Sequence, residues 1–450
     1  MFRVHQLRKT RRINDVTGQT LKPKSTLWLN WSTACHSVPD QLCPGDKKQV
    51  TEKQKPQRSP CQPVLDLFNQ QYSQELESLW PSIRSVLLKP QSWQHGVMLN
   101  RFTSVTGVTQ TLLSQGFSRI LPQSNAPALL HDSILTGNNP LLSNVFDCPP
   151  DDDNDTHPQC DSTPCSQSED LQLERLHSLP QPSLQCYTHP HPLRFPSQPH
   201  RAGQIKQYYL LNASSLLPVL ALQVCDGEKV LDLCSAPGGK AVAIMQCATP
   251  ALLCCNEPDP HRRDWLVKTL ESFLPHALRS RVIVSSRDGR CAGQNEAVTY
   301  DKVLVDAPCS NDRSWLYSCS SPQGEQRLKE KARLPALQAQ LLKNRVAVER
   351  PGGLVVYSTC TLSRAENHDV VETVLRACPE AEPEDLWEEI AVPFSQQFAF
   401  APSSYTNGDP SHNRPKPMKK HADHRLGILV VPQPGKTWGP MFLSRIRRRR

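Results

Sequence analysis

Short apolar runs alternate with longer segments of helical periodicity from about Gln204 to the C-terminus. The short runs predict β-strands and the longer segments predict helices. This order is typical of a doubly wound α/β domain with a mostly parallel sheet, which we expect over residues 201–450. The expected strands are 229–233, 251–256, 281–285, 302–306 and 354–358, and the expected helices are 240–247, 262–273 and 334–350.

The N-terminal half has a weaker hydrophobic pattern. Apolar residues recur at helical spacing on both sides of Pro81, so we expect two helices within a small helical segment over 63–121. Residues 1–62 and 122–200 are instead rich in proline and polar residues. Because such segments bury too little apolar surface to offset their ordering entropy, we expect both to be disordered or looped.

The charge distribution suits a polyanionic partner without requiring one. The chain has 51 Lys and Arg against 43 Asp and Glu, a formal charge of +8. Basic residues crowd the stretch from Arg3 to Arg12, and no acid precedes Asp15. This pattern is typical of a mitochondrial transit peptide, although a solvated basic terminus has the same composition. We read the arginine run at 445–450 as a solvated terminus in preference to a phosphate-binding tail.

Cysteine content and hydropathy limit the class of protein further. The 17 cysteines are odd in number and follow no secretory segment, so we expect reduced thiols. No apolar run approaches the roughly 20 residues that cross a bilayer, so we expect no membrane contact. Cys186, His189 and His191 lie close together in sequence, but a fourth ligand is missing and we expect no metal.

A glycine-containing turn follows the first expected strand of the α/β domain. Glycines between a strand and a helix let the backbone approach a ligand, and the helix N-terminus offers free N–H groups there. A Gly-Gly pair alone is more often a tight loop. The candidate cofactor-binding residues of this turn are Cys234, Ser235, Ala236, Pro237, Gly238, Gly239 and Lys240.

Acidic residues follow three further strands. Glu257 is placed to accept the hydroxyls of a ribose, Asp288 to meet an adenine amino group, and Asp306 ends the next strand. The carboxyl ends of strands converge on the crevice where such sheets bind ligands. Each residue alone has a second reading as a helix N-cap or a solvated turn.

Two cysteines occupy equivalent positions just past strand ends. Cys309 follows Asp306-Ala307-Pro308, and Cys360 follows Ser358-Thr359. A lone buried cysteine is usually an inert packing residue. Two cysteines on the sheet edge that carries the glycine turn are harder to explain by packing, so we regard them as candidate catalytic residues.

Segments 234–240, 306–309 and 358–360 together resemble the Sun-domain family of RNA cytosine-5 methyltransferases. The resemblance extends from about Gln204 to the C-terminus, and more weakly over the segment around 66–102. It implies the class I, Rossmann-like fold and S-adenosylmethionine as cofactor. It also implies Cys360 as nucleophile, Cys309 as the group that assists product release, and Asp306 near both base and cofactor.

The run at 306–315 looks like the mitochondrial branch of this family, as do segments 208–218 and 99–102. A role within that branch is methylation of the wobble cytidine of methionine tRNA, as the precursor of 5-formylcytidine. We therefore expect a monomeric enzyme of the mitochondrial matrix that acts on tRNA and not on DNA. Candidates for RNA contact are Trp93, Arg101, Arg313 and Trp315.

The sequence departs from the family in two places and leaves three alternatives. Ser235 replaces the usual alanine, and the 122–199 stretch is longer than expected. The alternatives are a mitochondrial ribosomal-RNA methyltransferase with a helical-repeat partner, an inactive RNA-binding scaffold, and a DNA-type enzyme. In the DNA-type enzyme Cys309 would be the nucleophile, but Cys360 in its Ser-Thr-Cys context favours the RNA family.

Overall fold

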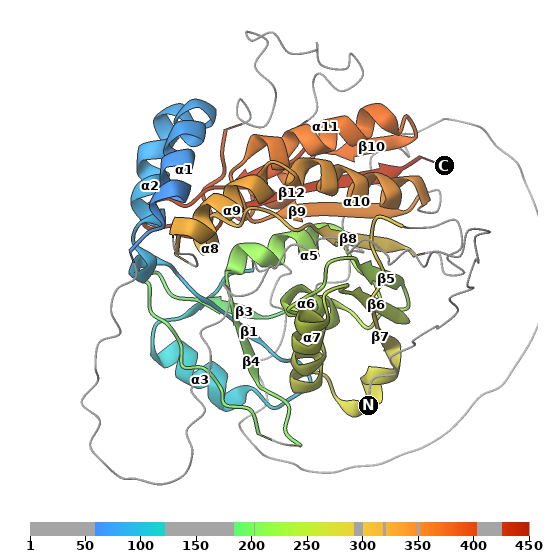
Figure 1. Cartoon of the computed structure of the whole chain (residues 1–450). Helices are drawn as coiled ribbons and strands as arrows, with labels where there is room; N and C mark the ends of the chain where they lie inside the picture. Colours follow the sequence, from blue (N-terminus) through green and yellow to red (C-terminus); the bar gives the residue numbers. More distant parts are fainter. Residues whose placement is uncertain are drawn as a thin grey trace, which may run out of the picture. The chain divides into compact units, whose positions relative to one another are not determined.

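An eight-stranded sheet forms the larger part of the computed structural model, which describes residues 59–121, 184–201, 203–291, 300–317, 321–348, 352–402 and 425–449 (Figure 1). The strand order is β10-β12-β9-β8-β5-β6-β7, with β11 beside β12. Strands β9, β8, β5, β6 and β7 run parallel, and β12 is antiparallel to its three neighbours. The bounds are β5 (Lys229–Asp232), β6 (Leu252–Asn256), β7 (Val282–Ser285), β8 (Lys302–Asp306), β9 (Leu354–Thr359), β10 (Ala381–Glu384), β11 (Ile428–Val430) and β12 (Met441–Arg448).

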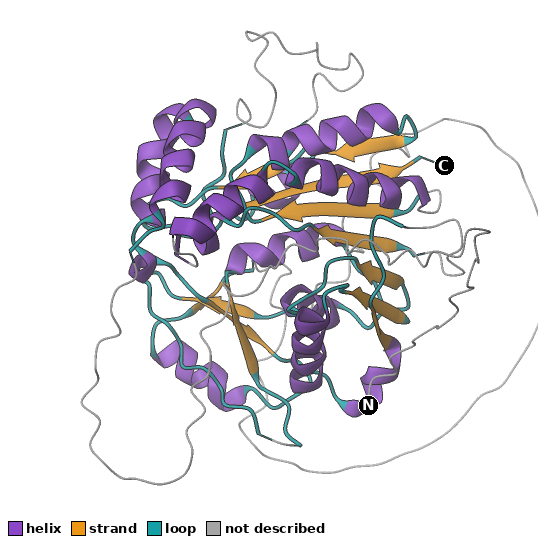
Figure 2. Ribbon diagram, viewed as in Figure 1, coloured by secondary structure: helices purple, strands orange, loops and turns teal. Residues whose placement is uncertain are grey.

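Helices cover both faces of this sheet (Figure 2). Consecutive residues of β8 alternate between two cores, because Leu304 packs on one side while Val303 and Val305 pack on the other. Burial on both faces explains why the central strands are continuous apolar runs. The first face carries α5 (Leu217–Leu222), α6 (Gly239–Cys247) and α7 (Pro260–Phe273), and the second carries α10 (Leu334–Val348) and α11 (His368–Ala377).

The doubly wound, mostly parallel architecture predicted from the sequence is confirmed. The five predicted strands and three predicted helices agree with the structure to within one or two residues at each described end. Helices α5, α8 (Asp312–Tyr317), α9 (Ser321–Lys331) and α11 were not predicted; α8 and α9 lie between β8 and β9. No described helix is long and apolar enough to cross a membrane.

The predicted N-terminal helices contribute to the core of the second face, and the first of them packs against α8 and α9. They are α1 (Gln62–Glu75) and α2 (Trp80–Leu87), on either side of the break expected at Pro81, with α2 beginning one residue earlier. Phe68 and Tyr72 of α1 belong to the same core as Trp315 and Leu342 of the α/β domain. The short helical turns are η1 (Glu77–Leu79), η2 (Pro90–Ser92), η3 (Ala213–Leu216), η4 (His276–Arg281), η5 (Arg364–Glu366) and η6 (Trp387–Ala391).

A second, antiparallel sheet has the strand order β2-β3-β1-β4. Its core includes Leu112, Phe117, Tyr187 and Phe195. The elements are β1 (Gly96–Leu99), α3 (Thr106–Ser114), β2 (Ser118–Arg119), β3 (Cys186–Thr188) and β4 (Tyr208–Leu211).

The second sheet corrects two expectations: that 63–121 is a helical segment, since β1 and β2 lie within it, and that residues 122–200 are entirely looped or disordered. β3 is a fully buried strand that pairs with both β1 and β2. A three-residue strand is too short to show periodicity, and its conformation comes from its partners rather than from local propensity. The rest of the prediction, for 1–58 and 122–183, lies outside the described residues.

Asn100 connects the second sheet to the α/β domain. It is 1% exposed, and its side-chain amide donates to the carbonyl oxygens of Lys206 at 2.7 Å and Phe273 at 2.9 Å. Its carbonyl oxygen accepts a hydrogen bond from Gln246 of α6 at 3.3 Å. The 99–102 segment, which contributed to the family resemblance, therefore has a structural role at this asparagine.

The expectation of a solvated C-terminus at 445–450 is wrong for Arg445 and Ile446, which are buried, whereas Arg449 is exposed. Residues 445–448 lie in β12, between β9 and β10. The Arg445 guanidinium is buried, with ion pairs to Glu384 at 2.5 Å and Glu389 at 2.6 Å. A buried cation persists because carboxylates surround it, which a run of arginines in the sequence does not reveal.

Candidate active site

The glycine turn joins β5 to α6 over a buried carboxylate. Asp232, the last residue of β5, is 1% exposed, and burial raises its pKa to about 7. One of its oxygens accepts a hydrogen bond from Ser235 at 2.8 Å, while the other has no hydrogen-bond partner among the described residues. Ser235, which replaces the family's usual alanine, thus contributes a hydrogen bond to the floor of the turn.

Glycine is required at two positions of this turn. Gly238 has a φ of +108°, and a Cβ there would lie 3.1 Å from side-chain atoms of Leu266 and Thr269 on α7. A Cβ on Gly239 would lie 3.2 Å from the Tyr209 ring and hydroxyl. The turn therefore packs closely against α7 and β4, and its backbone stays uncovered by side chains of its own.

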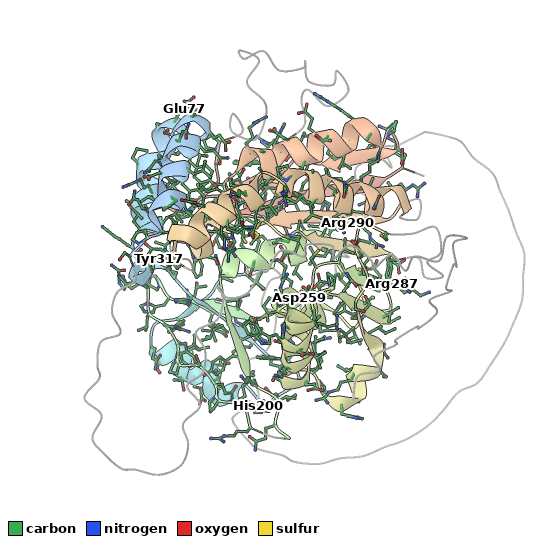
Figure 3. The ribbon with its side chains drawn as sticks, viewed as in Figure 1. Glu77, His200, Asp259, Arg287, Arg290 and Tyr317 are labelled. Atoms are coloured by element: carbon green, nitrogen blue, oxygen red, sulfur yellow. The ribbon has the colours of Figure 1, made fainter. Side chains whose placement is uncertain are left out.

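Glu257 lies at the carboxyl end of β6 and is already engaged. Its side chain is 2% exposed, accepts the N–H of Asp259 at 3.0 Å, and pairs with Arg262 at 3.3 Å. Burial raises the pKa of Glu257, and the Arg262 charge opposes that shift. Asp259, labelled in Figure 3, is the residue just before α7.

Asp288 lies in the loop after β7 and is held by Arg290. The Arg290 guanidinium donates to both carboxylate oxygens, and the shortest of the three contacts is 2.6 Å. These hydrogen bonds keep the pKa of Asp288 below its ordinary value. A carboxylate has acceptor capacity beyond two donors, so Asp288 keeps the predicted ability to accept from an amino group.

Asp306 lies at the centre of the strand ends. Its carboxylate forms an ion pair with Lys240 at 2.7 Å and accepts a hydrogen bond from Ser358 at 2.7 Å. Burial lowers the pKa of the Lys240 ammonium, but the charge and hydrogen bond of Asp306, together with the charges of Cys360 and Asp232, outweigh burial and the net pKa is raised. The first residues of α6 and the ends of β8 and β9 thus share one charged hydrogen-bond group.

The two predicted cysteines lie against each other. Their Sγ atoms are 3.3 Å apart, and the backbone N–H of Cys360 points to the Cys309 sulfur at 3.3 Å. Their adjacent strands are parallel, with the Ala307 N–H donating to the Ser358 carbonyl at 2.9 Å. Cys309 is buried, whereas Cys360 is partly exposed and therefore the more accessible thiol.

Sequence reasoning missed a buried polar group behind the two cysteines. Its carboxylates are Asp312 and Glu366, and both are 1% exposed or less. Asp312 follows Cys309 by three positions in the recognised run, a signal that was available. Glu366 belongs to no recognised motif, and nothing in the sequence marks it as a candidate site residue.

Of the four candidates for RNA contact, Trp315 is wrong. It is 1% exposed and packs in the core of the second face, as large aromatic residues usually do. Arg313 stacks on the Trp93 ring at 4.5 Å, and Arg101 donates to the Ala248 carbonyl at 2.8 Å. Trp93, Arg101 and Arg313 stay predictions.

Two sets of described residues bear on the expectation that the protein binds no metal. Cys186 is buried in the second sheet, and the Nδ1 atom of His189 lies 3.1 Å from the backbone carbonyl oxygen of His191. Elsewhere in the described chain His368, Asp369 and Glu372 lie close enough to share an ion. Arginines already pair with the two acids, at 3.2 Å and 2.6 Å.

A doubly wound sheet with a glycine turn, acids at successive strand ends and two touching thiols defines a class I methyltransferase fold with cysteine chemistry. Comparison with known proteins agrees. The sequence profile described as 16S rRNA methyltransferase RsmB/F matches residues 219–422. A solved structure of a methyltransferase homolog protein from Pyrococcus horikoshii has a TM-score of 0.52 and 19% identity, covering 86% of this chain and 98% of that one.

Curated relatives narrow the family. The chain is 46% identical to a Danio rerio protein named tRNA (cytosine(34)-C(5))-methyltransferase, mitochondrial, over 88% of this chain and 89% of the relative. The Mus musculus protein of that name is 40% identical, over 86% and 91%. The 5-cytosine rRNA methyltransferase NSUN4 of Xenopus tropicalis is 34% identical, over 86% and 91%. The chain belongs to the family of S-adenosylmethionine-dependent RNA cytosine-5 methyltransferases.

Proposed function

We propose that the protein methylates carbon 5 of the wobble cytidine, position 34, of a mitochondrial tRNA. The observation that carries this proposal is the pair of thiols, Cys309 and Cys360, 3.3 Å apart and at the strand ends that also hold Asp306. Cytosine C5 is a poor nucleophile until a thiolate adds at C6. A second thiol beside the first provides a group for releasing the product.

The glycine turn and its surrounding acids fit S-adenosylmethionine. The α6 N-terminus at Gly239 offers backbone N–H groups to a ligand, and Asp306 places a carboxylate at the end of the neighbouring strand. When bound, this cofactor supplies an electrophilic methyl group. In this proposal it is held by Cys234, Ser235, Ala236, Pro237, Gly238, Gly239, Lys240, Glu257, Asp288 and Asp306.

Cys360 acts as the nucleophile. Its thiolate forms a bond to C6 of the cytosine, and the electron pair of the C5–C6 double bond makes C5 nucleophilic toward the methyl group. Asp306 accepts a hydrogen bond from the exocyclic amino group and holds the base in register. Lys240 keeps the Asp306 carboxylate oriented, because the ion pair between them is only 2.7 Å long.

Release needs a base near C5 once the methyl group is in place. Cys309 assists removal of the C5 proton, the C5–C6 double bond re-forms, and the Cys360 sulfur leaves C6 as a thiolate. The buried position of Cys309 beside Cys360 suits this second step. The more exposed Cys360 suits the first.

The relatives support a tRNA substrate. The two relatives named for tRNA cytosine 34 are 46% and 40% identical, against 34% for the relative named for rRNA. Bases in a single-stranded anticodon loop leave their stack at little cost, as cysteine attack at C6 requires. Methionine tRNA in the mitochondrial matrix, acted on by a monomer with no DNA substrate, is the specific form of this proposal.

The rival proposals differ from this one in the substrate, in the presence of activity or in the identity of the nucleophile. The NSUN4 relatives favour ribosomal RNA as the second candidate substrate. An inactive scaffold is disfavoured because both thiols, Asp306 and the glycine turn occur together. A DNA-type mechanism would move the nucleophile to the buried Cys309.

Bisulfite sequencing tests the proposal. Mitochondrial RNA is incubated with S-adenosylmethionine and wild-type protein, Cys360→Ala or Cys309→Ala, with Cys225→Ala as a control at an exposed cysteine. We expect 5-methylcytosine at position 34 of methionine tRNA with the wild type and Cys225→Ala. Cys360→Ala should give none, and Cys309→Ala should accumulate a covalent RNA adduct.

Other outcomes distinguish the rivals. Methylation confined to ribosomal RNA would transfer the proposal to that substrate. Adduct formation that persists in Cys360→Ala and disappears in Cys309→Ala would reverse the cysteine roles. Absence of methylation in every RNA would favour the scaffold.

A further inference from the structure

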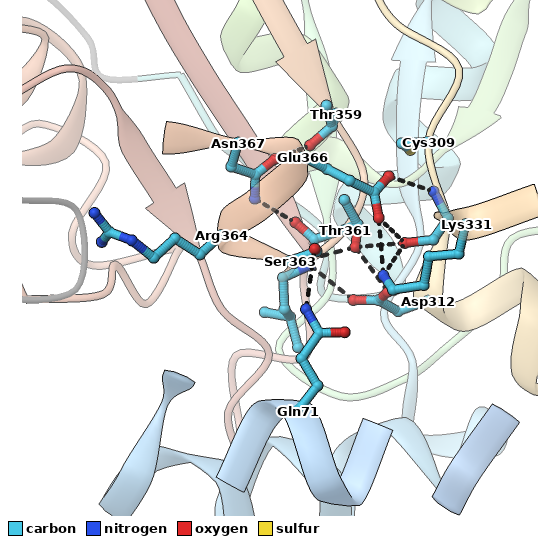
Figure 4. Close-up of polar contacts among 12 residues, drawn as sticks. Gln71, Cys309, Asp312, Lys331, Thr359, Thr361, Ser363, Arg364, Glu366 and Asn367 are labelled. Atoms are coloured by element: carbon cyan, nitrogen blue, oxygen red, sulfur yellow. Dashed lines mark hydrogen bonds and ion pairs between the residues drawn. The ribbon is translucent and has the colours of Figure 1, made fainter. Parts of the chain in front are cut away.

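Buried carboxylates join the two cysteine loops by hydrogen bonds (Figure 4). We call the loop at 307–312 the Cys309 loop and the loop at 360–366 the Cys360 loop. Between them lie Asp312 and Glu366, at 0% and 1% exposure. Ionised side chains this deeply buried are costly unless every oxygen has a donor.

Glu366 reaches from the Cys360 loop to the Cys309 loop. It accepts the backbone N–H of Ser310 at 2.9 Å and the Ser310 hydroxyl at 2.6 Å. Lys331 of α9 donates to it at 2.8 Å, and Gln338 of α10 at 3.1 Å. Since Ser310 directly follows Cys309, Glu366 fixes the backbone on which that thiol is carried.

Asp312 reaches in the opposite direction. It lies in the Cys309 loop and accepts the backbone N–H of Leu362 at 2.7 Å and the hydroxyl of Thr361 at 2.9 Å. Tyr72 of α1 donates its hydroxyl to Asp312 at 2.9 Å. Each cysteine loop therefore contributes one carboxylate that binds a backbone N–H of the other loop.

We propose that Glu366 and Asp312 form a reciprocal clasp that sets the spacing of the Cys309 and Cys360 sulfurs. Both are positioning residues, since they act through Ser310 and Leu362. The inference rests on the proposed function for its kinetic consequence. Attack at C6 uses Cys360 alone, whereas release uses both sulfurs, so loosening the clasp slows release more than attack.

Glu366→Gln is the variant that tests the clasp most directly. All four groups that contact Glu366 donate hydrogen bonds to it. In Glu366→Gln an amide NH2, which can only donate, replaces one of the accepting oxygens and faces groups that also donate. A matched control is Glu75→Gln on α1. Glu75 accepts the backbone N–H of Arg364 at 3.0 Å, so it holds the same Cys360 loop without touching the Cys309 loop.

Single-turnover assays separate the two steps. The rate of covalent RNA adduct formation is read on denaturing gels, and the rate of free 5-methylcytosine product is read in parallel. For Glu366→Gln we expect adduct formation within about threefold of wild type and release slowed about tenfold or more, so that adduct accumulates. Glu75→Gln is expected to release product within about threefold of wild type.

A second readout needs no RNA and stays valid if the proposed function fails. Diamide oxidises the two thiols to a disulfide: two electrons and two protons pass from Cys309 and Cys360 to the diazene, which becomes a hydrazine. Peptide mapping by mass spectrometry follows this cross-link. We expect Glu366→Gln to slow it about tenfold and Glu75→Gln to leave it unchanged, because the rate depends on sulfur spacing.

The clasp is overturned if Glu366→Gln and Glu75→Gln slow cross-linking equally, or if adduct formation and release fall together. Should Glu366→Gln fail to fold, Asp312→Asn takes its place with the same expectations. Wild-type protein that cross-links normally but methylates no RNA would defeat the proposed function and leave the clasp standing.

Discussion

Asp232 places a carboxylate in the core beneath the glycine turn, with one oxygen lacking a hydrogen-bond partner among the described residues. Burial raises its pKa to about 7, and the Asp306 charge adds to the rise while Ser235 and Lys240 oppose it. The folded protein therefore binds this proton more tightly than the unfolded chain does. The stability that this group contributes is present below about pH 4 and is lost as the pH rises through about 7.

Asp232→Asn should flatten this dependence. We expect the decrease in the free energy of unfolding between pH 5 and pH 8 to be smaller in the variant by on the order of 1 kcal/mol or more. Urea titrations at several pH values measure it. Identical pH dependence in variant and wild type would show that Asp232 is ionised in the folded protein at pH 5.

Individual site residues could be predicted where a reactive side chain follows an apolar run that the sequence identifies as a strand. Cys309, Cys360 and Asp306 follow apolar strands directly, so their convergence followed from the parallel sheet. Glu366 was not predictable, because its Ser310 partner lies 56 positions away and no motif contains it. Hydrogen bonds between loops depend on tertiary placement, which periodicity does not encode.

The α6 helix depends on the backbone just before it. Gly238 adopts a positive φ immediately before the helix begins, and α7 leaves no room for a Cβ. Gly238→Ala should lower the free energy of unfolding by about 1–3 kcal/mol through strain and contact with Leu266 and Thr269. S-adenosylmethionine binding should weaken as the turn moves.

Thermal unfolding and calorimetric titration with S-adenosylmethionine measure these two effects. The exposed Gly227 also has a positive φ but open space around it, so Gly227→Ala isolates the cost of φ alone. Equal losses in both variants would mean that contact with α7 contributes nothing. Unaltered cofactor affinity in Gly238→Ala would separate the turn from binding.

Buried parallel strands and the helices with the clearest periodicity were predicted, whereas β3 and β12 were not, and neither were α9 and α11 despite their 11 and 10 residues. α7 and β8 showed their patterns over enough residues to locate both ends closely. β3 spans three residues and exists because β1 and β2 lie on either side of it. β12 was obscured by its arginines, whose charges are satisfied by glutamates distant in sequence.

Across the whole molecule, β2 and β3 are antiparallel neighbours although residues 122–183 separate them in the chain. Ser118 lies opposite Thr188, and the Ile120 N–H donates to the Cys186 carbonyl at 3.0 Å. Residue 121, where one described range ends, and residue 184, where the next begins, therefore lie close together. The free energy of bringing the two ends of the connection together therefore changes only slowly with the number of residues between them.

Replacing 122–183 with a Gly/Ser linker of about eight residues should preserve the fold. The entropy cost of closing a connection falls as its number of residues falls, so we expect stability equal to wild type or higher by on the order of 1–2 kcal/mol. Differential scanning calorimetry measures the change, and circular dichroism checks the fold. A large decrease in Tm would show that the replaced segment contributes packing.

The same adjacency offers a way to follow the protein in cells. A fluorescent domain or affinity peptide inserted between β2 and β3 would be attached at both ends to neighbouring strands. The basic stretch near Arg3 would keep its native sequence, and β12 would keep its place in the large sheet. Imaging of organelle targeting could thus proceed without fusing a reporter to either terminus.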